Sequence, residues 1–213
     1  MLEQRTWPDL SRPHLTRRSP CGGGVCITKN VSTPAHKALA RKVAALSTVL
    51  LKNAPPIVEP PRRTPLLPLS PSATKGGGEG KLKVALIGSD AETPYTAGAG
   101  SGHVPDSNVA VSPLMAFAAR PGVEVSYHSG CKDRKLDAAA AKAAAAADVA
   151  LVFVSATSGE GHDRASLNLS HVGGCSGAAQ EELIELVAER QPKTAVVMAV
   201  PGPVVTAGWR EKV

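Results

Sequence analysis

The sequence predicts an α/β fold: a three-layer α/β sandwich in which helices cover a mostly parallel sheet of about four strands. Four apolar runs of strand length lie between residues 83 and 201, and segments with helical signals separate them. Three of these runs show little alternation of apolar and polar residues, which is typical of strands buried on both faces. Strands joined through helices form right-handed β-α-β crossovers, and such crossovers build a parallel sheet.

The first half of this pattern occupies residues 83–128. The run KVALIG (83–88) is the first expected strand, and Ser112-Pro113 begins a helix that continues through Arg120. The following Pro-Gly pair ends that helix, because neither residue continues helical backbone well. The run VEVSYH (123–128) is the second expected strand.

The second half repeats the alternation. Asp137 is the expected N-cap of the alanine-rich helix DAAAAKAAAAAD, and alanine has the highest helix propensity. The strand VALVFVS (149–155), the amphipathic helix QEELIELVAERQ (180–191) and the strand TAVVMAVP (194–201) follow. The sequence then stops at TAGWREKV, where another helix and strand are expected. We therefore expect a sheet that is incomplete at the C-terminus.

The residues before the sheet divide into three expected segments. Residues 1–31 are basic and rich in Arg, Pro and Gly without an apolar period, which indicates disorder. Residues 32–53 contain a connecting helix that Thr33 caps, and residues 54–80 form a Pro/Gly-rich linker to the α/β domain at 81–213. One face of the connecting helix is apolar at Leu39, Val43, Leu46 and Leu50.

Composition excludes several kinds of binding protein. Aromatic residues are only 3% of the 213, which argues against an aromatic sugar-binding platform and an aromatic-rich RNA reader. Residues 1–83 carry 14 Lys and Arg against 4 Asp and Glu, but no dense basic block. We interpret this basic N-terminal part as a solvated tail, and we expect no nucleic-acid partner.

Membrane and secretion signals are also not visible. No uncharged apolar run reaches the ~18 residues that a membrane span needs. The N-terminal residues lack the apolar core of a signal peptide, so the localisation stays open, and an extracellular location requires an incomplete N-terminus. Two N-x-S sequons, at Asn30 and Asn168, accept glycans only if the protein is secreted.

Cysteine and histidine spacing predicts no metal site and no cofactor. A zinc site needs two close pairs of ligands, whereas the six histidines are scattered and only one cysteine pair is close. We interpret all four cysteines as unpaired thiols: Cys21, Cys26, Cys131 and Cys175.

Two long glycine-rich loops follow expected strands, at residues 88–108 and 155–177. Ligands gather at the carboxyl ends of parallel strands, and loops of this length are often functional. The run Gly98–Gly102 lies too far from its strand for a dinucleotide turn, and no Lys-Ser/Thr pair completes a P-loop. A triad of Ser158, His162 and Asp163 can be drawn on paper, but no G-x-S-x-G elbow supports it.

The segment TSGEGHDR (157–164) is the sharpest signal. Its glycines permit a tight, exposed backbone, and Glu160 lies between two of them beyond the end of a buried strand. Asp163 and Arg164 are adjacent, so we expect each to pair elsewhere and to brace the loop. On spacing alone, a glutamate in a loop is most often a solvated surface residue.

Several segments in a consistent order resemble glycoside hydrolase family 3. They begin with a helix ending in VLLKN, continue through KVALIGSDA and VALVFVSATSGEGHDRASLNL, and end with QEELIELVA, TAVVMAVPGPVV and Trp209. The resemblance covers about residues 32–213 and is to the connecting segment and the C-terminal α/β sandwich domain of β-glucosidases, β-xylosidases and related exo-acting enzymes.

The resemblance implies hydrolysis of O-glycosyl bonds by two carboxylates. In this family an aspartate on a barrel attacks the anomeric carbon, and a glutamate on a sandwich loop protonates the leaving oxygen and later activates water. Glu160 is the residue similar to that acid/base, and the environment must raise its pKa for the acid step. Asp163 and Arg164 match the accompanying Asp-Arg, which we interpret as bracing the loop.

The resemblance also leaves the barrel, with its nucleophile and sugar pocket, outside these 213 residues. We therefore expect a glycoside substrate shared with a missing barrel domain, and no turnover by this chain alone. A non-catalytic α/β module that docks on a separate barrel or another protein is the alternative. A nucleotide-binding α/β protein is a third interpretation, and it rests on fold class alone.

Overall fold

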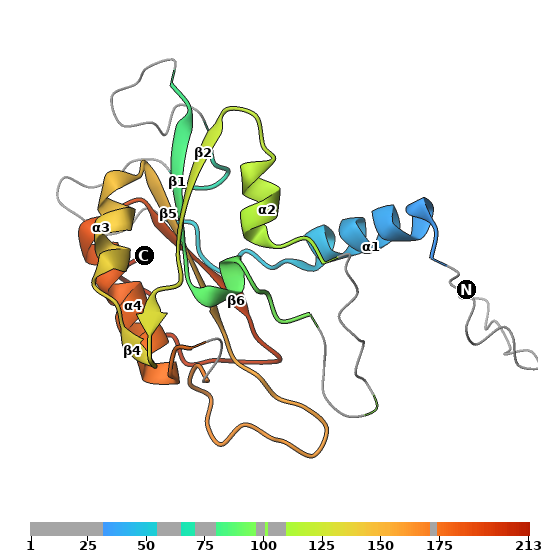
Figure 1. The fold of residues 1–213 in the computed structure, drawn as a ribbon. Helices are drawn as coiled ribbons and strands as arrows, with labels where there is room; N and C mark the ends of the chain where they lie inside the picture. The colour runs from blue at the N-terminus through green and yellow to red at the C-terminus, as the bar shows by residue number, and fades with distance from the viewer. Residues whose placement is uncertain (1–31, 55–64, 71–79, 97–100, 102–109, 171–173) are drawn as a thin grey trace, which may run out of the picture. The chain divides into compact units, whose positions relative to one another are not determined.

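The computed structural model describes residues 32–54, 65–70, 80–96, 101, 110–170 and 174–213 (Figure 1). The chain falls into two units, Met1–Leu51 and Lys52–Val213. The expected disordered segment at residues 1–31 lies outside the described residues.

The described part of the first unit is helix α1 (Pro34–Ser47). The Thr33 hydroxyl accepts a hydrogen bond from the His36 N–H at 3.1 Å, and Pro34 takes a first-turn position where no N–H is needed. The helix ends at Ser47, before the end of the predicted segment 32–53. It buries none of its residues, so its apolar stripe is exposed.

The second unit contains a four-stranded sheet in the order β2-β1-β5-β6, and every neighbouring pair is parallel. The strands are β1 (Leu82–Ile87), β2 (Val123–His128), β5 (Val149–Ser155) and β6 (Thr194–Ala199). This sheet confirms the predicted α/β class and strand number. All seven residues of β5 are buried, as expected for a central strand with helices on both sides.

Helices cover both faces of the sheet, which gives the three layers (Figure 1). Successive strand residues point to opposite faces, so Ala85 and Ile87 contact one layer while Val84 and Leu86 contact the other. The first layer holds α3 (Ala139–Ala146) and α4 (Gly177–Arg190), and the second holds α2 (Pro113–Ala118).

Helix caps explain where two of these helices begin. The Ser112 hydroxyl accepts from the Met115 N–H at 3.2 Å, so α2 starts as expected. The Ser176 hydroxyl caps α4 through the Ala179 N–H at 3.1 Å, which starts this helix three residues before the predicted Gln180. Asp137 accepts from the Ala139 N–H at 2.9 Å, although the N-cap position itself is Ala138.

Three small elements were not expected. A 3-10 turn, η3 (Ser89–Ala91), follows β1, and β3 (Cys131–Lys132) pairs antiparallel with β4 (Lys135–Leu136). Asp133 and Arg134 join β3 to β4 with φ of 51° and 65°. Because this turn uses left-handed backbone without glycine, the usual sequence signal of a hairpin is missing.

Part of the range expected to be linker packs on the sheet. Leu66 and Leu69 lie on the same side of the sheet as α2, and they pack against the buried residues of β1 and β5 there. The Asn53 side-chain amide donates to the Leu67 carbonyl at 2.7 Å, and its oxygen accepts from the Leu67 N–H at 3.0 Å. This two-way bond fixes residues 65–70 to the end of the preceding segment.

The prediction of unpaired thiols is wrong for two of the four cysteines. Cys131 and Cys175 form a disulfide with a Cα–Cα distance of 5.4 Å and a sequence separation of 44 residues. The unexpected β3–β4 hairpin brings Cys131 beside the start of α4, and that proximity is not visible in the spacing. Cys21 and Cys26 lie outside the described residues.

Among the described helices, none combines the length and apolar character that crossing a bilayer requires.

Candidate functional site

The candidate site lies at the carboxyl edge of the sheet. All four strands run parallel, so the segments that follow β1 and β5 leave the sheet at this edge. Strands β1 and β5 are neighbours, which places the two long glycine-rich loops next to each other. The glycine run at residues 98–102 lies outside the described residues except for Ser101.

Glu160 occupies the tip of a two-residue turn, which we call the turn tip (residues 159–162). The Gly159 N–H donates to the His162 carbonyl at 3.1 Å, and the His162 N–H donates back to the Gly159 carbonyl at 2.9 Å. Gly161 has a φ of 72°, which glycine adopts without a steric penalty. The sequence therefore folds this segment into a short hairpin that presents Glu160 to solvent.

The carboxylate of Glu160 is bound by one residue of the neighbouring loop. Oε2 accepts from the Ser101 N–H at 2.7 Å and from the Ser101 hydroxyl at 2.6 Å. These two bonds stabilise the charged form and lower the pKa of Glu160, although the side chain is fully exposed. The direction is opposite to the raised pKa that the resemblance implied for an acid catalyst.

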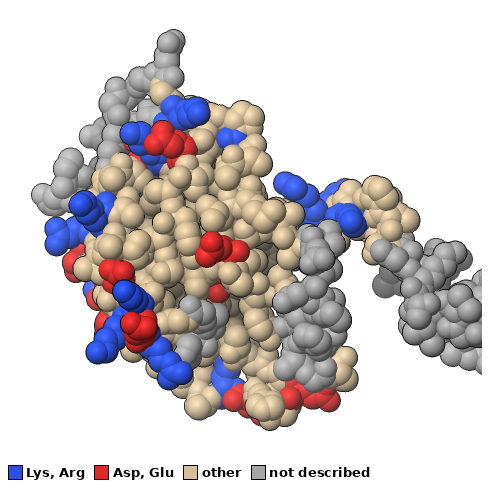
Figure 2. Space-filling view, in the orientation of Figure 1, with Lys and Arg blue, Asp and Glu red and all other residues tan. Residues whose placement is uncertain are grey.

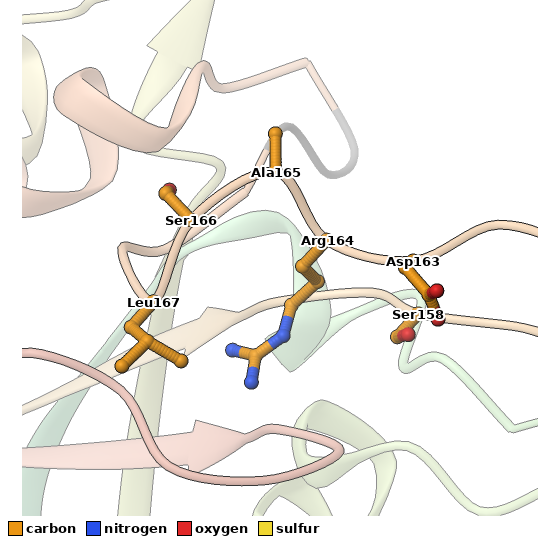
Figure 3. Close-up of a pocket in the computed structure, with 6 residues that line it drawn as sticks. All are labelled: Ser158, Asp163, Arg164, Ala165, Ser166 and Leu167. Carbon is orange, nitrogen blue, oxygen red and sulfur yellow. The ribbon is translucent and has the colours of Figure 1, made fainter.

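Arg164 and Asp163 behave differently. Arg164 Nη2 donates to the Pro203 carbonyl at 3.0 Å, which links the loop to the segment after β6. Its Nη1 is buried and has no hydrogen-bond partner among the described residues. In Figure 3 the Asp163 carboxylate lies beside Ser158 and apart from the Arg164 guanidinium, and Asp163 is exposed. Arg164 therefore contacts a second segment, and the bracing role of Arg164 and Asp163 stays a prediction.

These residues line an open surface depression of about 430 Å³. Its lining residues are Ser158, Asp163, Arg164, Ala165, Ser166 and Leu167 (Figure 3). The depression is too open to enclose a sugar by itself, since ligand pockets usually bury most of the ligand.

The loop is closed by what we call the loop base: Ser155, Ser170 and the side chain of Gln180. The buried Gln180 accepts from the Ser155 N–H at 2.8 Å, and its amide donates to the carbonyls of Ser155 at 3.1 Å and Ser170 at 2.5 Å. The Ser170 hydroxyl also accepts from the Thr157 N–H at 2.7 Å. The sequence does not single out Gln180, because this residue looks like one of the polar residues of an amphipathic helix.

A buried carboxyl lies close to the loop base. Both Asp90 oxygens and the Ser155 hydroxyl are buried without a well-formed hydrogen bond to the described residues. Burial raises the pKa of Asp90, and the nearby Ser155 hydroxyl offsets part of the rise. Burial, then the charge of Glu92, raises the pKa of Tyr127 to about 12.

The remaining sequence candidates do not form a second centre. The Ser158 hydroxyl donates weakly to the His162 backbone carbonyl at 3.4 Å, and the histidine ring faces the Glu160 carbonyl, so no Ser-His-Asp triad is arranged. The described ranges contain no cluster of three metal-ligating side chains. On the face shown in Figure 2, Lys and Arg are interspersed with Asp and Glu.

Known proteins match this chain over most of its length. The model of the glycosyl hydrolase family 3 C-terminal domain matches residues 48–213. A probable β-glucosidase E from Neosartorya fischeri is 33% identical over 202 residues, covering 82% of this chain and 17% of the relative. A thermostable β-glucosidase B from Acetivibrio thermocellus is 32% identical over 189 residues, covering 84% of this chain and 22% of the relative.

Solved structures show the same correspondence. The family 3 β-glucosidase of Bifidobacterium adolescentis has a TM-score of 0.65 and 29% identity, covering 85% of this chain and 24% of that protein. A family 3 β-glucosidase of Neurospora crassa has a TM-score of 0.62 and 28% identity, covering 84% and 21%.

The chain thus spans about a fifth of the length of these relatives. The match includes the sheet, the helices on both faces and the segment that carries Glu160. The resemblance read from the sequence is confirmed, and the chain belongs to glycosyl hydrolase family 3, to which it contributes the C-terminal domain.

Proposed function

We propose that this chain supplies the acid/base carboxylate, Glu160, to a β-glucosidase-like hydrolysis of O-glycosyl bonds. The observation that carries the proposal is the position of Glu160 at the turn tip, exposed at the carboxyl edge of the sheet. A carboxyl in this exposed position is accessible to a sugar held by a second domain. The names of the relatives, which are mostly β-glucosidases, support this reaction class.

The proposed reaction has two steps. Protonated Glu160 first gives its proton to the glycosidic oxygen as the C–O bond breaks, and a carboxylate on a barrel domain bonds to the anomeric carbon. Ionised Glu160 then takes a proton from water, whose oxygen bonds to the anomeric carbon and releases the nucleophile. The two carboxyl groups must lie ~5 Å apart in such a retaining enzyme.

For the sugar of the substrate, we propose a chemical class and not an individual sugar. Two relatives from Bifidobacterium are named exo-α-(1->6)-L-arabinopyranosidases, at 30% and 28% identity. Because relatives with different sugar names match the same domain, we propose a pyranoside substrate and assign the choice of sugar to the barrel.

A chimera tests this function. Residues 48–213 replace the matching segment of the Acetivibrio thermocellus β-glucosidase, and hydrolysis of aryl β-glucosides is measured. Glu160→Gln is expected to lower kcat/KM about 10²- to 10⁴-fold on glycosides with poor leaving groups, and much less on activated ones, because kcat/KM reports the first step and only poor leaving groups need the proton there. On both kinds of substrate kcat is expected to fall, because the second step loses its base.

Glu182→Gln, an exposed glutamate on α4, is the matched control and is expected to leave kcat unchanged. An active chimera in which Glu160→Gln has no effect would contradict the proposal. The 213-residue chain alone is expected to show no turnover.

The alternative of a non-catalytic docking module is favoured by one observation. The apolar side chains of α1 are more than half exposed, at 59% for Leu39, 57% for Val43 and 75% for Leu46, and Leu50, which follows the helix, is 63% exposed. Exposed apolar stripes of this kind often contact another protein. If the chain docks on a barrel polypeptide, mixing the two shifts the size-exclusion profile and Leu46→Glu abolishes the shift.

A further inference from the structure

We propose that Ser101 is a positioning residue for Glu160: its backbone N–H and hydroxyl hold the Glu160 carboxylate in place. This inference rests on the proposed function of Glu160 and adds a residue to it. The evidence is geometric. Two donors of a single residue, the backbone N–H and the hydroxyl, meet the same carboxylate oxygen at 2.7 and 2.6 Å.

The contact joins segments that are 59 residues apart in the sequence. It crosses from the loop after β1 to the loop after β5, and these strands are paired in parallel register. Among the described residues, the turn tip is otherwise held by its own backbone bonds, by the Ser158 hydroxyl on the His162 carbonyl at 3.4 Å, and by the contact between the His162 ring and the Glu160 carbonyl at 3.2 Å. Ser101 is therefore the described residue that fixes where the carboxylate itself points.

The contact also has a chemical consequence. Both bonds favour the ionised carboxylate, which is the form that removes a proton from water in the second step. They oppose the protonated form that the first step needs. The titratable groups next to Glu160 in the sequence of its own loop are His162 and Asp163, followed by the cation Arg164, and Ser101 is the described residue that faces it from the loop after β1.

The balance between the two steps then depends on Ser101. In the assembled enzyme, a second carboxylate brought near Glu160 raises its pKa, because like charges disfavour ionisation. Ser101 lowers the pKa of Glu160, so that Glu160 stays ionised and acts as a base after it has donated its proton. A serine at this position thereby sets the upper pH limit of activity.

The first experiment titrates the full 213-residue chain by NMR with ¹³C-labelled glutamate carboxyl groups. Ser101→Ala removes the hydroxyl donor, so the pKa of Glu160 is expected to rise towards its ordinary value. Ser101→Thr keeps the hydroxyl and is expected to restore the wild-type pKa. Ser158→Ala is the matched control, since it removes a serine hydroxyl from the same loop without touching the Glu160 carboxylate.

A reciprocal measurement needs no change at position 101. The Ser101 amide proton is expected to shift with pH along the Glu160 titration, and Glu160→Gln is expected to abolish that shift. An unchanged Glu160 pKa in Ser101→Ala overturns the proposal, as does an equal change in Ser158→Ala or a Ser101 amide that does not follow Glu160.

The chimera separates this proposal from the proposed function. In the chimera, Ser101→Ala is expected to move the alkaline limb of the pH profile of kcat to higher pH, because Glu160 then stays protonated up to a higher pH. If Glu160→Gln leaves turnover intact while the NMR coupling is present, the acid/base role fails and the positioning contact stands. If Glu160→Gln removes turnover and the coupling is missing, only the role of Ser101 fails.

Discussion

The loop base and the turn tip belong to one loop, yet they are stabilised in different ways. The loop base is buried, and a single side chain, Gln180, bonds the backbone on both sides of the loop. The turn tip is exposed and holds itself through two backbone bonds and the contact with Ser101. Stability is therefore concentrated at the base, while the residue proposed to do the chemistry is at the part that contributes least to folding.

Loss of the disulfide is expected to have the largest effect on folding. Cys131–Cys175 fastens the far end of this loop to the β3–β4 hairpin and closes 44 residues. The double substitution Cys131→Ser, Cys175→Ser is expected to lower the free energy of unfolding by about 4 kcal/mol, from the chain entropy of a loop of that length. Urea unfolding of the wild type with and without a thiol reductant checks the same difference. Equal midpoints in all cases would show that the bond adds nothing to the base.

A pair of glycine substitutions compares base and tip directly. A Cβ on Gly177 would lie 2.0 Å from the Leu169 carbonyl oxygen, whereas a Cβ on Gly161 meets open space. Gly177→Ala is expected to cost about 3 kcal/mol through overpacking against backbone. Gly161→Ala is expected to cost about 1 kcal/mol, from its φ of 72° alone. Thermal unfolding of the two variants gives the comparison, and the opposite ranking would refute it.

Asp90→Asn examines the buried carboxyl beside the base. The folded-state pKa of Asp90 is raised, so the folded protein holds this proton more tightly than the unfolded chain. Stability is therefore highest below the unfolded pKa of about 3.9 and falls as pH rises through the folded value. Asp90→Asn is expected to remove this fall and to raise the melting temperature at pH 7. Melting curves from pH 3 to 8 report it, with Asp163→Asn as an exposed control. A parallel pH profile in both variants would speak against a buried charge.

Glu160→Gln is expected to have the smallest effect on stability. The side chain is exposed, and its bonds to Ser101 are surface contacts, so the urea unfolding midpoint should stay close to that of the wild type. Combined with a large loss of kcat in the chimera, this result would separate chemistry from folding at one residue. A clear loss of stability on urea unfolding would instead mean that the tip supports the fold.

The sequence predicts those parts that depend on local patterning. The segment VEVSYH and the continuous apolar run VALVFVS match the observed bounds of β2 and β5, and the Ser112-Pro113 pair gives the start of α2. The pattern predicts the start of α4 too late, because Gly177 and its neighbours are typical of loops, whereas the Ser176 cap starts the helix at Gly177.

The contacts between distant segments could not be predicted in the same way. Strand order is not encoded in periodicity, so nothing in the pattern pairs Ser101 with Glu160 or Cys131 with Cys175. A buried glutamine such as Gln180 looks like any polar helix residue until the loop that it closes is known. The position of Glu160 beyond a buried strand was predictable, whereas the lowered pKa required its partner.

The way in which Gln180 closes the loop has an evolutionary consequence. Because the two ends meet at Ser155 and Ser170, insertions or deletions between them leave the sheet and α4 undisturbed. Doubling the length of such a segment costs only about 0.6 kcal/mol in closure entropy. A longer or shorter segment between these two serines can therefore form without rebuilding the scaffold.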